Sequence, residues 1–152
     1  MGHGTIQGKL EPLSRMEKLQ NIYFLRKSKG PSLAKVNYIL LPSICRYSLC
    51  NIIITPIWLI YYTFKTNASC IIAYHIIPYA FIAAIASYIT RRPYFIGQTG
   101  LLIQEQSKNK ILWFFLKKVF NAAEKLCVPG NISYKYWRSR GIGANKLLML
   151  HS

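Results

Sequence analysis

Few side chains in this chain could act as acids, bases or metal ligands. The carboxylates are four in number and widely spaced: Glu11, Glu17, Glu105 and Glu124. The histidines are three and equally scattered: His3, His75 and His151. Acid–base catalysis and metal binding need such groups in pairs or clusters, and the sequence also lacks the motifs GxxxxGK[ST], HExxH and GxSxG. We therefore predict that the chain is not an enzyme and holds no cofactor or metal ion.

His75 is the one imidazole within a long apolar stretch. As a haem ligand it would need an axial partner, and no second histidine lies in that stretch. A histidine that makes a hydrogen bond between packed helices is the simpler interpretation. The cysteines (Cys45, Cys50, Cys70 and Cys127) form no CxxC motif, so we expect free thiols with a packing role.

The stretch that must position these residues is 47–90, where Lys65 is the one charged side chain. It separates two uncharged runs, 47–64 and 69–90, which as helices would be about 27 Å and 33 Å long. A bilayer core is about 30 Å thick, so each run could cross it. The alternative is a pair of buried helices in a soluble domain. We predict an all-α membrane protein built on a two-helix transmembrane hairpin.

The charge of the chain is strongly positive, with 20 Lys and Arg against 4 Asp and Glu, or +16. Nineteen of the cations flank the hairpin, eight in 1–46 and eleven in 91–152. Because positive segments stay on the cytosolic or matrix side of a membrane, both termini are predicted to share that side. This favours a multi-pass protein of the mitochondrial inner membrane with matrix termini; the alternative is the endoplasmic reticulum membrane with cytosolic termini.

Three regions follow from this pattern. Residues 1–46 form a basic arm with an amphipathic helix at 14–29, where Ser14 and Glu17 have the spacing of a capping box. Residues 47–90 are the hairpin. Residues 91–152 form a second basic arm with an amphipathic helix at 110–127. Both helices are expected to lie at the membrane interface or against a partner.

Two sets of candidate contact residues result. Cations next to the membrane could bind anionic phospholipid such as cardiolipin: Arg46, Arg91, Arg92, Lys117 and Lys118. Polar and small side chains of the crossings could pack against helices of other membrane subunits: Asn51, His75, Ala80, Ala83, Ala84 and Ser87. The aromatic and basic residues 134–138 could contact RNA, but lipid and protein partners are favoured over nucleic acid.

Residues 86–93, Ala-Ser-Tyr-Ile-Thr-Arg-Arg-Pro, are followed by Gly97, Gly100 and Leu101-Leu102. This segment resembles the small two-helix accessory subunit of mitochondrial complex I, in which a membrane helix precedes Arg-Arg-Pro, a glycine and an apolar return. In that family Arg-Arg-Pro joins the two helices, whereas here it follows the second predicted crossing. The resemblance covers fewer than 20 residues and favours complex I over cytochrome complexes or ATP synthase.

The predicted function is therefore that of a non-catalytic accessory subunit of a respiratory complex, which contributes to assembly and stability. Two alternatives belong to other classes. One is a membrane-shaping or lipid-binding hairpin that acts alone, and the other is a membrane-tethered, ribosome-associated protein.

Overall fold

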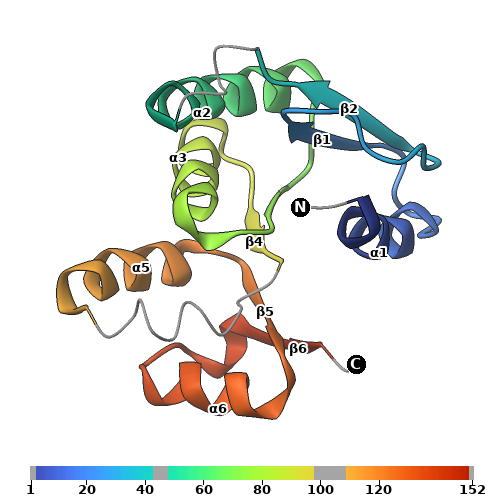
Figure 1. Ribbon diagram of the computed structural model, residues 1–152. Helices are drawn as coiled ribbons and strands as arrows, with labels where there is room; N and C mark the ends of the chain where they lie inside the picture. The colour runs from blue at the N-terminus through green and yellow to red at the C-terminus, as the bar shows by residue number, and fades with distance from the viewer. Residues whose placement is uncertain (1–2, 43–47, 98–108, 151–152) are drawn as a thin grey trace. The chain divides into compact units, whose positions relative to one another are not determined.

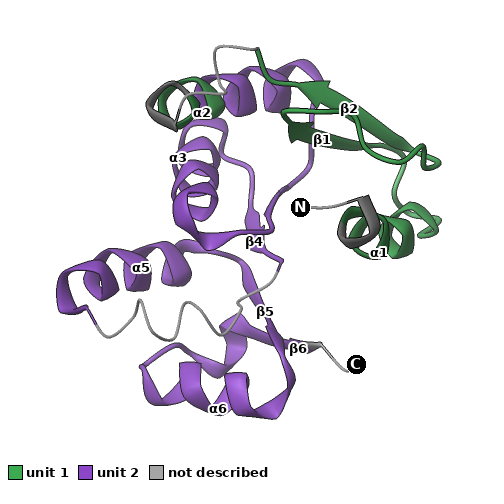
Figure 2. Ribbon diagram, in the orientation of Figure 1, with its two compact units in different colours: residues 1–55 green, residues 56–152 purple. Residues whose placement is uncertain are grey.

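The computed structural model describes residues 3–42, 48–97 and 109–150 (Figure 1). The chain divides into two compact units, residues 1–55 and residues 56–152 (Figure 2). The boundary falls within helix α2 (Ser48–Lys65), whose first half belongs to unit 1 and whose second half belongs to unit 2. Each unit contains helices and parallel strands, so the chain has an α/β fold.

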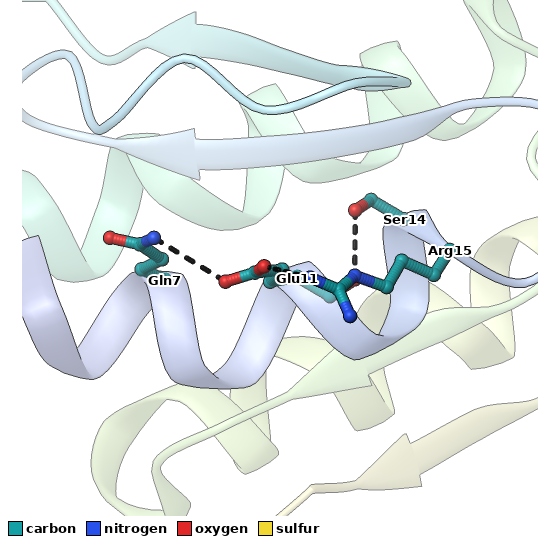
Figure 3. Close-up of polar contacts among 4 residues, drawn as sticks. All are labelled: Gln7, Glu11, Ser14 and Arg15. Carbon is teal, nitrogen blue, oxygen red and sulfur yellow. Dashed lines mark hydrogen bonds and ion pairs between the residues drawn. The ribbon is translucent and has the colours of Figure 1, made fainter.

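Unit 1 begins with helix α1 (His3–Ser14) and continues into two paired parallel strands, β1 (Ile22–Arg26) and β2 (Val36–Leu40). Ile6 and Leu10, four residues apart on one face of α1, are buried. Glu11 organises the end of α1 (Figure 3). It accepts hydrogen bonds from Gln7 and Ser14, and its carboxylate lies 2.5 Å from the guanidinium of Arg15.

The predicted amphipathic helix at 14–29 is wrong. Ser14 ends α1 instead of starting a helix, and its hydroxyl donates a 2.8 Å hydrogen bond to the backbone oxygen of Glu11. Residues 22–26, Ile-Tyr-Phe-Leu-Arg, form strand β1. A β-branched residue followed by two aromatics favours a strand, because such side chains fit a pleated surface. Pairing with β2 decides the outcome.

Unit 2 contains a four-stranded parallel sheet with the strand order β3-β4-β5-β6. The strands are β3 (Ile71–Ala73), β4 (Tyr94–Ile96), β5 (Lys125–Pro129) and β6 (Leu147–Leu150). The segments between them are the irregular turn η2 (Ile76–Ala80), helices α3 (Phe81–Thr90), α5 (Lys110–Ala122) and α6 (Gly130–Ser139), and the short turn η3 (Ala144–Lys146). Helices α3, α5 and α6 thus alternate with the four strands along the chain (Figure 1).

One face of this sheet carries the core of unit 2. Alternate strand residues, among them Ile96 and Leu126, are fully buried and pack in one cluster with residues of all three helices. From the helices come Ala83 of α3, Phe120 of α5 and Trp137 of α6. The three helices therefore cover the same face, as expected when each successive strand is added on the same side of the last.

The predicted second crossing, 69–90, is not one helix. Its first residues form β3, η2 follows, and only α3, ten residues and about 15 Å long, is a regular helix. Strand β3 is apolar throughout, Ile-Ile-Ala, although only Ile71 and Ala73 face the core and Ile72 is 42% exposed. The uncharged run consists of a strand followed by a helix that is buried on one face, and the number of apolar residues alone cannot distinguish this from a membrane span.

The predicted first crossing, 47–64, coincides with α2, although Tyr47 lies outside the described residues. Three polar side chains of α2 are buried: Asn51, Thr55 and Thr63. The hydroxyl of Thr55 donates a 2.8 Å hydrogen bond to Asn51, and the hydroxyl of Thr63 donates one of 2.7 Å to the backbone oxygen of Leu59. Across the described ranges, no helix combines the length and the apolar character that crossing a membrane requires.

These findings correct the predicted fold class and location. The all-α transmembrane hairpin is wrong, and with it the assignment as a multi-pass protein of the mitochondrial inner membrane or the endoplasmic reticulum membrane. The flanking regions are not extended basic arms either, because both contain paired strands. Where a helix was predicted at 110–127, α5 ends at Ala122 and residues 125–129 form the central strand β5.

Candidate ligand-binding edge of the parallel sheet

The carboxyl ends of β3, β4 and β5 lie side by side at one edge of the sheet, here called the carboxyl edge. The register pairs Ala73 with Ile96, and Ile96 with Leu126. Adjacent strands are about 4.8 Å apart, so Ala73 and Leu126 are about 10 Å apart, and β5 continues three residues beyond this level to Pro129. Loops that leave such an edge are the usual place for a ligand in an open parallel sheet.

One register position beyond these pairs comes a row of three residues: Tyr74, Gly97 and Cys127. The Tyr74 ring lies against Gly97, where a Cβ atom would come within 2.8 Å of the ring. Burial raises the pKa of the Tyr74 hydroxyl, and the neighbouring Cys127 raises it further. Burial also raises the pKa of the Cys127 thiol. The hydroxyl of Tyr74 and the thiol of Cys127 are therefore both neutral near pH 7. This row of residues adds no charge to the carboxyl edge.

Strand β5 passes directly into α6 at this edge. The residue before the helix is Pro129, which has no side chain able to cap it, and no side-chain cap is present. Gly130 has a φ of +69°, a conformation that favours glycine, and a Cβ there would meet no atom within 4 Å. Asn131 and Ile132 of the first helical turn are exposed. The N–H groups of a first helical turn have no acceptor within the helix. In α6 this turn is at the exposed surface.

His75 lies two residues past the end of β3, at the same edge. Its backbone is extended (φ −125°, ψ 143°) and it is exposed. Its ring centroid lies 6.3 Å from that of Tyr79. An imidazole can donate a hydrogen bond and carries a positive charge when protonated. The carboxyl edge therefore combines an uncapped helix start with one titratable donor.

Several charged groups that the structure describes in unit 2 are at the opposite, amino edge of the sheet. Lys125 and Lys146 begin or precede strands there, and each donates a 2.8 Å hydrogen bond from Nζ to a backbone oxygen, of Asn145 and Ala123 respectively. Glu124, next to Lys125, is the carboxylate that the structure describes in this unit. It is not at the carboxyl edge, where a negative ligand would meet it.

The predicted lipid-binding cations are dispersed over this structure. Arg91 and Arg92 lie between α3 and β4, and Nη2 of Arg92 donates a 2.7 Å hydrogen bond to Asn67. Lys117 and Lys118 are on α5. Arg46 lies outside the described residues.

The predicted helix-packing residues have several different environments. Ala80 and Ala83 are buried in the core of unit 2, and Ala84 packs against it. The hydroxyl of Ser87 donates a 2.6 Å hydrogen bond to the backbone oxygen of Arg92. Asn51 is buried on α2, and His75 is exposed at the carboxyl edge. The small-residue face of α3 thus packs within this chain.

Sequence reasoning missed Tyr74, Gly97, Gly130 and Asn131. One signal was present: the apolar segment 126–128 is followed by Pro129 and Gly130, which can end a buried strand just before a helix. It was not recognised because 110–127 was treated as one helix. No family model matches this chain and no curated protein matches it.

Proposed function

We propose that unit 2 binds a small phosphorylated ligand of the nucleotide class at the carboxyl edge of its parallel sheet. The observation that carries the proposal is the uncapped, exposed start of α6 immediately after the central strand β5. His75, at the end of β3, supports it as a second polar contact.

The preference for phosphate follows from the polarity of the helix. Backbone N–H groups of a first turn point along the axis, and the helix dipole adds a partial positive charge at the same end. A phosphate can accept several of these hydrogen bonds at once. Because Gly130 has no side chain and open space in front of it, an anion can approach the backbone closely. A carboxylate at this edge would oppose binding, and Glu124 is at the other edge.

The size of the ligand follows from the spacing of the strand ends. His75 lies two residues past Ala73 and Gly130 lies four residues past Leu126, so a group that contacts both must span two strand separations and an offset of two residues, about 12 Å in all. A nucleoside diphosphate reaches over such a distance, whereas inorganic phosphate can contact only one end. Two contacts that act together should therefore make a nucleoside diphosphate bind more tightly than phosphate.

Two glycine variants test this proposal. Gly130 and Gly141 both have positive φ, +69° and +82°, but Gly141 follows α6 and precedes β6, at the amino edge. Alanine at either position should lower stability by about 1–2 kcal/mol, because left-handed backbone is strained for non-glycine residues. Only Gly130→Ala is expected to weaken ligand binding, by at least about tenfold, since disturbing one hydrogen bond to a charged group costs about 1.5–3 kcal/mol.

The measurement is isothermal titration calorimetry with uridine, adenosine and guanosine diphosphates, and with inorganic phosphate for comparison. Equal affinity in Gly130→Ala and Gly141→Ala would contradict the proposal, as would an absence of heat with all three diphosphates at millimolar concentration.

The accessory-subunit hypothesis is not carried forward, because the hairpin that motivated it is wrong. The same applies to a hairpin that shapes membranes. That the chain is not an enzyme stays a prediction, since binding a nucleotide is compatible with catalysis and with its absence.

A further inference from the structure

Helix α5 has large apolar side chains on the face that points away from the core. Its inward face buries Leu116, Val119 and Phe120 in unit 2. At 100° per residue, Ile111 and Phe114 project to the opposite side and Phe115 lies at the border, next to Val119. The exposed fractions of Ile111, Phe114 and Phe115 are 73%, 56% and 52%. Single exposed apolar residues are ordinary, but three on one arc of a helix form a patch that indicates a binding surface.

This apolar patch is interleaved with positive charge. Lys118 projects between Ile111 and Phe114 and holds its Nζ 4.5 Å from the centroid of the Phe114 ring. Lys110 borders the patch on one side, whereas Lys117 on that side extends its Nζ toward Gly141. The helix sequence contains no Asp or Glu from 110 to 122. The face is therefore complementary to a partner that is both apolar and negatively charged.

We propose that this face, defined by Ile111, Phe114, Phe115 and Lys118, docks the chain on the surface of an anionic phospholipid bilayer. The helix, 13 residues and about 20 Å long, would lie in the plane of the interface. The apolar side chains enter the region between headgroups and acyl chains, and the lysines stay with the phosphates. This surface docking involves no crossing of the membrane and is independent of the proposed nucleotide site.

A lipid surface fits this face better than a nucleic acid does. Single-stranded RNA is bound by aromatic rings that bases can stack on and by cations that follow the phosphate backbone. Here the cation Lys118 lies on a ring face itself, and Ile111, the most exposed apolar side chain of the patch, offers no stacking surface. An interfacial helix, in contrast, needs this mixture of aliphatic, aromatic and basic side chains.

Sedimentation of the full chain with vesicles tests the proposal. Binding is expected to vesicles of phosphatidylcholine with phosphatidylglycerol, and to be at least tenfold weaker without phosphatidylglycerol. The double variant Phe114→Ser/Phe115→Ser should weaken binding to the anionic vesicles at least tenfold. Lys118→Gln should weaken it about fivefold, because one lysine near an anionic surface contributes about that factor. High salt should reduce the binding of the unaltered chain.

The control is Ile132→Ser on α6, a single apolar side chain that is 81% exposed and outside the α5 patch. It should bind vesicles as the unaltered chain does. A Phe115→Trp variant gives a second readout, since lipids brominated on their acyl chains should quench its added fluorescence. Equal loss in Phe114→Ser/Phe115→Ser and in Ile132→Ser, no quenching at position 115, or salt-sensitive binding to an RNA oligonucleotide without binding to vesicles would each overturn the proposal.

Discussion

Trp137→Ala should lower the free energy of unfolding by about 3–5 kcal/mol, the range for removing a large buried aromatic side chain. Trp137 is completely buried in the core of unit 2. Its ring stacks on Trp113 with a centroid separation of 5.9 Å and meets Phe120 edge-on at 5.2 Å. These contacts join α6 to α5, so the loss affects both helices that flank β5. Because domains are stable by only about 5–15 kcal/mol, a large part of that stability should disappear.

Urea unfolding followed by circular dichroism measures this effect. Ile132→Ala, on the same helix but 81% exposed, is the control and should change stability by less than about 0.5 kcal/mol. Trp137→Phe keeps a ring in the cluster and should fall between the two. If Trp137→Ala and Ile132→Ala were equally mild, the packing of α6 on the sheet would be wrong.

Ala86→Leu should destabilise the chain by about 1–3 kcal/mol, because extra methylene groups in a filled core force neighbours apart. Ala86 is fully buried on α3, in the same cluster as Ala80 and Ala83. The sequence had suggested that this small-residue face meets helices of other membrane subunits. In the structure the space next to Ala86 is already occupied by this chain.

The control for this change is Ala122→Leu at the exposed end of α5, where a larger side chain extends into solvent. It should leave the midpoint of urea unfolding nearly unchanged. If Ala86→Leu left the midpoint of urea unfolding unchanged, α3 would have free space on that face. A helix whose small-residue face binds another subunit would show this result.

The sequence predicted some helices and missed the sheet, for a physical reason. Helix α2 was found because it coincides with a long uncharged run, and the start of α5 was found because its lysines and apolar residues recur at helical spacing. Strands β3 and β4 have three residues each, too few to show a period. Their neighbours are also apolar, so β3 and α3 together looked like one long helix. Pairing between strands far apart in the sequence, such as Phe95 with Lys125, leaves no local signal.

The candidate site was hidden by the same limitation. Tyr74, Gly97 and Cys127 are far apart in the sequence and share a row only because three strands align. His75 was noticed but was interpreted inside a membrane helix. The lysines and arginines are numerous and therefore suggested a binding role. Two of them, Lys125 and Lys146, instead donate hydrogen bonds to backbone oxygens at the amino edge. The number of lysines and arginines gives the net charge of the chain. It does not indicate at which edge of the sheet a ligand binds.

The most direct test of the central claim is to locate the bound ligand by a titration of ¹⁵N-labelled protein with uridine diphosphate, followed by NMR. Backbone amide shifts at Gly130, Asn131 and His75 are expected to move together and saturate with one affinity. The amino edge provides the internal comparison, because unspecific attraction to phosphate would favour its cations. Shifts confined to residues such as Arg91 and Lys146, with Gly130 and Asn131 unmoved, would contradict binding at the carboxyl edge.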